Sequence, residues 1–141
     1  MKFNMLIMIA AAGLALAGCN KAESPAEVRH DVTDARADAQ RDVADAQADA
    51  RENMADAQKD MADAQANRDG DDVADATQDA SETAAKGEYK VAVAQAEATH
   101  KVALEKCEAM SGSAQKDCKD RADNDLDAAK KQAEIRRDGT G

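Results

Sequence analysis

The larger apolar residues in the middle of the chain recur at helical intervals. Val32, Val43, Met54, Met61 and Val73 follow one another at spacings of 11, 11, 7 and 12 residues. Eleven residues complete about three helical turns and seven complete about two, so these side chains return to nearly the same face. Alanines fill the positions between them at steps of three or four residues. This pattern predicts one long α-helix and not a strand.

The same region carries a start signal and a break. Ser24 suits an N-cap, Pro25 suits the first helical position, and Glu27 completes a capping box. The segment 67–72 (NRDGDD) interrupts the repeat with a glycine. We therefore expect an alanine-rich helix over 24–86 with a break near 67–72.

Bulkier apolar residues return after Gly87, and they predict a second unit over 87–141. The segment Ser111-Gly112-Ser113 is typical of a turn, with Gly112 in a left-handed conformation and Ser113 as the next N-cap. A second helix is expected from about Ala114 and is expected to stop at Asp138-Gly139. We expect His100 to pack between the two helices of this hairpin, near Asp125 or Leu126.

Together these patterns predict an all-α chain. A long, extended, acidic, alanine-rich helix is followed by a short, disulfide-stapled antiparallel helical hairpin, and there is no globular core. Most of the 43% hydrophobic content is alanine, while Leu, Ile, Val, Phe and Met are concentrated in the first 16 positions. Little apolar material is therefore left to build a core or the walls of a pocket.

Charge narrows the function classes. The chain has 29 acidic and 19 basic residues, a net charge of −10, and only one tyrosine and one phenylalanine. This balance argues against binding to nucleic acid. An EF-hand with Gly70 at its sixth position would begin at Gln65 and end at Ala76, so that motif fails. We find no nucleophile–base pair, metal-ligand cluster or phosphate-binding loop, and we expect no enzyme activity, metal site or bound cofactor.

The first residues have the layout of an export signal. Lys2 gives a short positive region, Met5 to Leu16 are apolar, and small residues follow. The four residues Leu16, Ala17, Gly18 and Cys19 resemble the bacterial lipobox. That resemblance implies removal of residues 1–18, a covalent diacylglycerol and an N-acyl chain on Cys19, and a short tether over 19–23. Two or more acyl chains give stable membrane anchoring.

The residue after the cysteine bears on the destination of such a protein. In the lipoprotein sorting pattern, an aspartate at this position retains the protein in the inner membrane, whereas this chain has Asn20. The resemblance therefore implies the periplasmic face of the outer membrane in preference to the inner membrane. An ordinary cleaved signal with an incidental cysteine is the alternative.

The other two cysteines flank the expected turn. Cys107 precedes Gly112 by five residues and Cys118 follows it by six, so an antiparallel hairpin brings them level. Export places them in an oxidising compartment, and we predict a Cys107–Cys118 disulfide. A metal-binding pair and a redox couple are the alternatives.

The segment from Tyr89 to Asp120, YKVAVAQAEATHKVALEKCEAMSGSAQKDCKD, resembles part of small proteobacterial lipoproteins that are labelled TolA-like or cell envelope biogenesis proteins. That resemblance implies an alanine-rich periplasmic helix that links envelope layers. The major lipoprotein of Braun is a second analogy, with a lipid anchor followed by an alanine-bearing helical rod.

Two functions follow from these observations. The first is a lipid-held structural spacer or interaction module of the cell envelope, with a protein partner on the C-terminal hairpin. Weak self-association through the alanine face is also open. The alternative is a stress-protective helix similar to late-embryogenesis-abundant repeats, which folds on neutralisation or drying.

Overall fold

The computed structural model describes residues 21–67 and 70–139. Three helices contain almost all of these residues: α1 (Pro25–Asn67), α2 (Gly70–Cys107) and α3 (Gly112–Asp138). No strand occurs in the two described ranges. The prediction of an all-α chain is confirmed.

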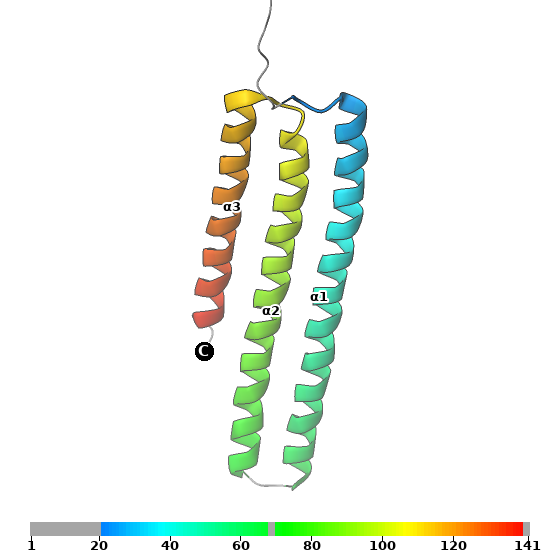
Figure 1. Ribbon diagram of the computed structural model, residues 1–141. Coiled ribbons are helices and arrows are strands. Elements are labelled where there is room, and N and C mark those ends of the chain that lie inside the picture. The colour runs from blue at the N-terminus through cyan, green and yellow to red at the C-terminus, as the bar shows by residue number, and fades with distance from the viewer. Residues whose placement is uncertain (1–20, 68–69, 140–141) are drawn as a thin grey trace, which may run out of the picture.

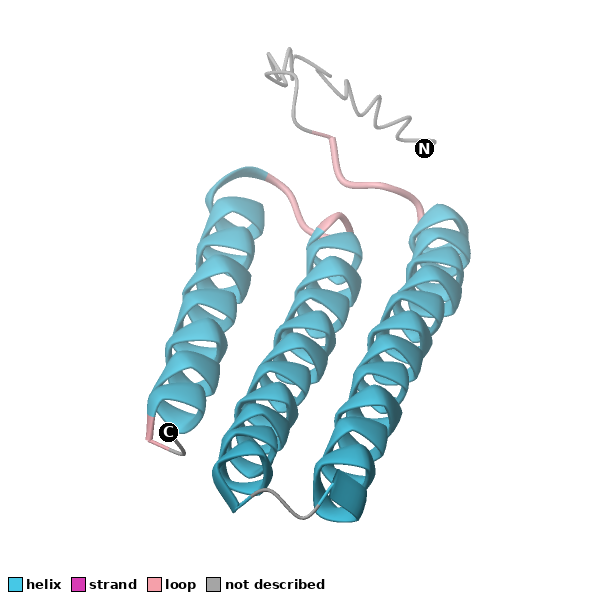
Figure 2. Cartoon of the chain, turned by 90° about the horizontal axis from the view of Figure 1, so that it is seen from below, coloured by secondary structure: helices cyan, strands magenta, loops and turns pink. Residues whose placement is uncertain are grey.

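The three helices lie side by side in a single layer with α2 in the middle (Figures 1 and 2). Both α1 and α3 pack against α2. Within the described residues, no Cα atom of α1 comes within 8 Å of a Cα atom of α3. The molecule is therefore a flat row of helices, and α2 is the only helix with a neighbour on both sides.

The start of α1 has the capping box that the sequence predicts. The backbone N–H of Ser24 donates to Oε2 of Glu27 at 2.9 Å, and the backbone N–H of Glu27 donates to Oγ of Ser24 at 3.3 Å. Both bonds satisfy backbone donors that have no carbonyl partner at a helix start. Hydrogen bonding to the Ser24 side chain, and next to the Ser24 backbone N–H, holds the pKa of the Glu27 carboxyl group below its usual value of 4.5.

The break expected at 67–72 is confirmed, and the chain reverses its direction there. α1 ends at Asn67 and α2 begins at Gly70. On the return path, Nζ of Lys101 lies 3.8 Å from Oδ2 of Asp38 and 3.7 Å from Oδ2 of Asp42. α1 and α2 therefore form an antiparallel pair of long helices.

The change of composition at Gly87, where the sequence analysis begins the hairpin, lies inside α2. Gly87 is buried, and a Cβ atom added to it would lie 3.2 Å from Cβ of Ala50 in α1. The glycine permits the close approach of α1 and α2 at this point. Both the last part of the repeat and the bulkier segment that follows it thus belong to one helix.

Small side chains form most of the buried surface. Among the described residues, only Cys107 and Ala133 have an exposed fraction as low as 1%. The expectation of a molecule without a globular core is confirmed. The buried apolar residues in the described part of the chain are Val28, Val32, Ala35, Ala39, Ala57, Ala64, Cys107, Ala122 and Ala133.

The turn between α2 and α3 differs in detail from the prediction. Gly112 has a φ of 61°, as its predicted left-handed conformation requires, but it is already the first residue of α3, and Ser111 precedes it as the N-cap. The expected N-cap at Ser113 and start at Ala114 are therefore wrong by two residues. Without a Cβ atom, Gly112 makes the sharp change of direction itself, so no residues are needed between the turn and the helix. The end of α3 at Asp138 is as predicted.

Candidate functional site

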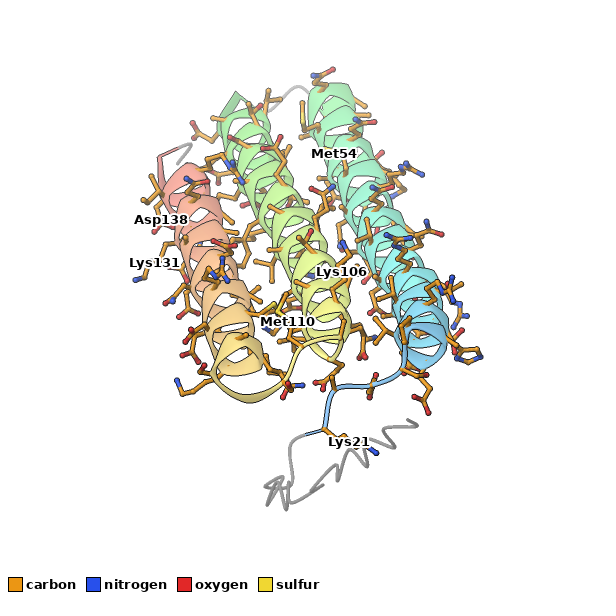
Figure 3. All side chains as sticks on the ribbon, turned by 90° about the horizontal axis from the view of Figure 1, so that it is seen from above. Lys21, Met54, Lys106, Met110, Lys131 and Asp138 are labelled. Carbon is orange, nitrogen blue, oxygen red and sulfur yellow. A yellow bond between two sulfur atoms is a disulfide. The ribbon has the colours of Figure 1, made fainter. Side chains whose placement is uncertain are left out.

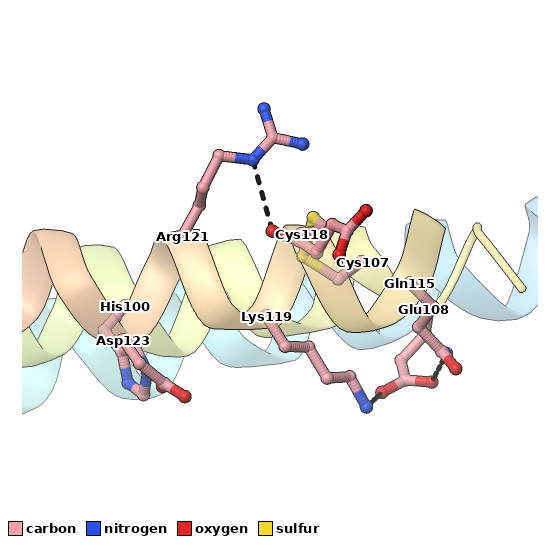
Figure 4. Close-up of a disulfide and its surroundings, with 9 residues drawn as sticks. His100, Cys107, Glu108, Gln115, Cys118, Lys119, Arg121 and Asp123 are labelled. Atoms are coloured by element: carbon pink, nitrogen blue, oxygen red, sulfur yellow. Dashed lines mark hydrogen bonds and ion pairs between the residues drawn. A yellow bond between two sulfur atoms is a disulfide. The ribbon is translucent and has the colours of Figure 1, made fainter. Parts of the chain in front are cut away.

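The disulfide predicted from the cysteine spacing is present at one end of the row. Cys107, the last residue of α2, is bonded to Cys118 in the second turn of α3, and their Cα atoms are 5.7 Å apart. Cys107 has an exposed fraction of only 1%. The bond covalently closes the hairpin of α2 and α3 beside its turn (Figure 4).

The residue after the first cysteine gathers further contacts. The carboxylate of Glu108 accepts a hydrogen bond from Nε2 of the buried Gln115 at 2.6 Å and pairs with Nζ of Lys119 at 2.5 Å (Figure 4). Both partners belong to α3. Hydrogen bonds to an ionised carboxylate are stronger than those between neutral groups. Glu108 therefore fixes the start of α3 against the end of α2 next to the disulfide.

The backbone of Glu108 also holds the segment that leads into α1. The backbone N–H of Glu23 donates to the carbonyl oxygen of Glu108 at 2.9 Å. Residues 21–24, which include the described part of the predicted tether (19–23), thus cross over the end of α2 before the chain enters α1 (Figure 1). From here on, the tether means residues 21–24. Lys21 at its start lies at the same end of the row as Met110 in the α2–α3 turn (Figure 3). We call this part of the molecule the tether end.

The side chain of Glu23 is unusual among the carboxylates of the molecule. It is half-buried, and its Oε2 atom is shielded from solvent without a hydrogen-bond partner. Burial raises its pKa above the usual value of 4.5, and the nearby carboxylates of Asp31, Glu108, Glu105 and Glu27 raise it further. Docking of the tether therefore favours the protonated form of Glu23, so the docked contact is stronger in acid than at neutral pH.

The predicted lipidation site is adjacent to the tether in sequence. Cys19 and the lipobox residues Leu16, Ala17 and Gly18 lie outside the described residues. The described chain begins at Lys21, two residues after Cys19. In the described part of the chain, no helix combines the length and the apolar character that a membrane crossing needs.

His100 lies between α2 and α3, as expected, but its partner differs from the prediction. Its Nε2 lies 2.6 Å from Oδ1 of Asp123, whereas the sequence predicts the neighbourhood of Asp125 or Leu126. Asp123 is two residues before Asp125 and about one helical turn before Leu126. A second bridge further along joins Nζ of Lys130 to Oε1 of Glu97 at 2.8 Å.

One face of the α1–α2 pair has an open groove. It consists of a cavity of about 580 Å³ around Ala50 and Gly87 and a cavity of about 530 Å³ around Val43 and Val102. Both cavities lie between α1 and α2, and the residues of α1 that line them fall on one continuous helical stripe. We call this surface the alanine groove.

The opposite face of the α1–α2 pair is acidic. A cavity of about 750 Å³ lies there. We call it the acidic face, because six carboxylates line it together with Lys86, Lys90 and Arg137: Asp56, Asp60, Asp72, Asp75, Asp79 and Glu82. In residues 21–67 and 70–139, no three His, Cys, Asp or Glu side chains are arranged to hold a metal ion.

The sequence predicts an acidic, alanine-rich helix, but the difference between the two faces of the α1–α2 pair was not predicted. The signal was present in α1, where Arg36, Gln40, Gln47, Arg51 and Gln58 follow one another at steps of four or seven residues. These residues line the alanine groove, whereas the aspartates of α1 lie on other sides of the helix. A helix with separate acidic and basic or neutral stripes has two different surfaces even when its net charge is strongly negative.

Comparison with known proteins gives no family for this chain. It matches no protein-family model, no curated protein and no solved structure.

Proposed function

We propose that this protein is a lipid-anchored periplasmic protein of the bacterial outer membrane, which serves as a structural spacer or interaction module of the cell envelope. In this proposal the acyl chains on Cys19 hold the protein on the membrane, and the row of three helices extends from it. In this proposal the role is not catalytic. The protein offers surfaces to partner proteins and holds them at a set distance from the membrane.

The docked tether is the observation that supports this proposal most strongly. The backbone N–H of Glu23 is hydrogen-bonded to the carbonyl oxygen of Glu108 beside the disulfide, and Glu23 is only four positions after Cys19. Four residues span at most about 14 Å. A lipid on Cys19 would therefore keep the tether end near the bilayer.

The length of α1 gives the spacer its reach. Its 43 residues correspond to about 65 Å along the helix axis. The end of α1 and the start of α2 lie at the end of the row away from the tether (Figure 1). With the tether end at the membrane, the far end can project by a distance of this order into the periplasm.

The disulfide agrees with such a location. Disulfides form and persist in oxidising compartments such as the bacterial periplasm. The apolar segment and the lipobox-like residues Leu16 to Cys19 in turn agree with export.

Fractionation of cells that express the Cys19→Ser variant tests the proposal. The wild-type chain should sediment with outer membranes and be released only by detergent. The variant should lose this attachment or keep its unprocessed size. The matched control Cys118→Ser should remain membrane-bound, because it removes the disulfide and leaves Cys19 intact. A Cys19→Ser chain that stays firmly membrane-bound at the mature size would contradict the proposal.

A hydration-dependent protective role is the second candidate. It is favoured by the thin alanine interface of α1, whose carboxylates repel one another at spacings of four residues. Circular dichroism separates the two roles. A spacer is helical in physiological buffer, whereas a protective chain gains its helix only on acidification or drying.

A further inference from the structure

The alanine groove is long enough to receive a helix. Its lining runs from Arg36 to Gln58 in α1, and on α2 it runs from Thr83 to Lys106. The α1 range covers about 33 Å at 1.5 Å per residue. A third helix that lies along two antiparallel helices fills the space between their side chains, as in helical bundles.

The floor of the groove has an apolar character that no described helix covers. Val43, Met54, Val91 and Val102 are half-buried there, among alanines. They lie along an elongated groove between two antiparallel helices, and such a groove matches the shape of a third helix better than that of a flat bilayer.

The charge of the groove is opposite to that of the whole molecule. Its lining contains Arg36, Arg51, Lys106 and Arg136 but only one acidic residue, Glu88. The chain as a whole has a net charge of −10. The groove is therefore a locally positive surface on an acidic protein.

Three of these cations have no acidic partner within the described chain. Arg36, Arg51 and Lys106 form none of the ion pairs in residues 21–67 and 70–139, although the chain has 29 acidic residues. Of the other cations in the described residues, Lys21, Arg29, Lys90, Arg121 and Lys131 also form no ion pair. Eight others each lie within 4.0 Å of a carboxylate: Arg41, Lys59, Lys86, Lys101, Lys116, Lys119, Lys130 and Arg137. The rim of the groove thus keeps its positive charges available to an external anion.

We infer that the alanine groove binds an acidic amphipathic helix of a partner protein. The apolar stripe of that helix, about 22 residues long, would lie on Val43, Met54, Val91 and Val102, while its flanking carboxylates pair with Arg36, Arg51 and Lys106. This inference rests on the proposed interaction function and names the class of partner. It does not depend on the lipid.

A second copy of this chain fits the groove less well. In a symmetric dimer through this face, the same positive rim occurs on both subunits, so like charges are gathered at one interface. The acidic face of another copy has complementary charge, but its lining contains no Val, Leu, Ile, Met or Phe to fill the groove. Charge and shape together favour a different protein.

A designed peptide tests the inference without knowledge of the natural partner. The probe is a fluorescent 22-residue helix with leucines along one stripe and glutamates on both flanks, and its control has lysine in place of each glutamate. Binding to the mature full-length chain in phosphatidylcholine nanodiscs is measured by fluorescence anisotropy. We expect saturable binding of the acidic peptide and none of the basic one.

Two double charge reversals locate the binding surface. Arg36→Glu with Arg51→Glu should weaken binding of the acidic peptide about tenfold. The matched control is Lys90→Glu with Lys131→Glu, which makes the same change in net charge. Lys90 lies on the acidic face and Lys131 on α3, at the edge of the row away from α1 (Figure 3). At about 0.15 M salt this control should change binding by less than about twofold.

A second variant tests the apolar residues at the floor of the groove. Val43→Ser with Met54→Ser should also weaken binding of the acidic peptide, and circular dichroism shows whether the helices persist.

Equal weakening by the two charge reversals would overturn the inference, as would binding of the basic peptide. Displacement of the peptide by phosphatidylglycerol vesicles would assign the groove to a membrane surface instead. A dimer in sedimentation that dissociates in the Arg36→Glu, Arg51→Glu variant would assign it to a second copy. Failure of Cys19→Ser to release the protein from membranes would leave these results unaffected.

Discussion

The two sides of α2 are joined to their neighbours in different ways. On the α1 side, alanines and Gly87 form the contact, and the only ion pairs between the two described helices are those of Lys101, at 3.7 and 3.8 Å. On the α3 side there is a disulfide, and the Lys130–Glu97 ion pair and the His100–Asp123 hydrogen bond are closer, at 2.8 and 2.6 Å. Near the end of α3, the guanidinium of Arg137 also lies over the ring of Tyr89, 4.7 Å from its centre.

The difference shows two routes to a stable helix pair when large apolar residues are scarce. α1 and α2 have 43 and 38 residues, so many weak contacts add up along their length. α3 has only 27 residues and is fixed by covalent and charged contacts instead. A short helix with few contacts gains more from a cross-link, because the bond removes freedom from the unfolded chain. We therefore expect α3 to depend on the disulfide much more than α1 does.

Loss of the disulfide should have the largest effect. The Cys107→Ser, Cys118→Ser variant should lose roughly 3 kcal/mol in the free energy of unfolding, the value for a loop of about a dozen residues. Urea denaturation followed by circular dichroism measures the change. Chemical reduction of the wild-type chain is the control and should give the same value. A loss below about 0.5 kcal/mol would mean that α3 is held by its other contacts.

A large side chain at Gly87 should disturb the other interface. A Cβ atom there would already lie 3.2 Å from Cβ of Ala50, so Gly87→Leu must push α1 away from α2. We expect a loss of about 2 kcal/mol by overpacking. Gly70→Leu is the matched control, because no atom lies within 4 Å of the Cβ position at Gly70. Equal stability of the two variants would show that α1 and α2 are not in close contact at Ala50.

Removal of the N-cap should weaken α1 alone. Ser24→Ala removes the acceptor for the Glu27 N–H, and the cost of such a change is typically about 1 kcal/mol. Hydrogen exchange should report faster exchange in the first turns of α1 and no change in α3. Ser111→Ala is the control, since Ser111 makes no side-chain capping bond.

The smallest expected effect concerns the tether. Burial raises the pKa of Glu23, so the docked tether is strongest below the usual pKa of 4.5 and weakens as the pH rises through the raised value. Glu23→Gln should therefore increase the protection of the backbone N–H of residue 23 against hydrogen exchange at neutral pH. It should also flatten the pH dependence of that protection.

The contribution of Glu27 to stability should have the opposite pH dependence, and Glu27→Gln should remove it. The pKa of Glu27 is lowered, so its contribution is present above 4.5 and is lost as the pH falls through the lowered value. NMR exchange rates between pH 3 and pH 7 measure both variants. If the protection of the residue 23 N–H has the same pH profile in Glu23→Gln and in the wild-type chain, this explanation is contradicted.

The local features of the fold follow from local sequence signals. The capping box of Ser24 and Glu27, the break before Gly70, the turn at Gly112 and the Cys107–Cys118 disulfide were all predictable. Each depends on a few neighbouring residues or on a short spacing. The chemistry of such signals is contained in the residues themselves.

The packing of the three helices against one another was harder to predict from the sequence. A break at 67–72 permits either a bend or a reversal, and alanine stripes on both sides of it do not choose between them. The choice depends on contacts such as Gly87 with Ala50, which are 37 residues apart in sequence. The hydrogen bond of His100 with Asp123, two residues from the predicted Asp125, likewise depends on how α3 packs against α2. The two faces of the α1–α2 pair appear only once α2 has been placed.

Hydrogen exchange across the whole chain tests the central comparison most directly. Mass spectrometry of the oxidised protein should show the strongest protection around Cys107 and Cys118, in both α2 and α3, and weaker protection along α1. Reduction of the disulfide should lower the protection of α3 to the level of α1 or below and leave α1 nearly unchanged. An α1 as strongly protected as the disulfide region, or an α3 unaffected by reduction, would contradict the account.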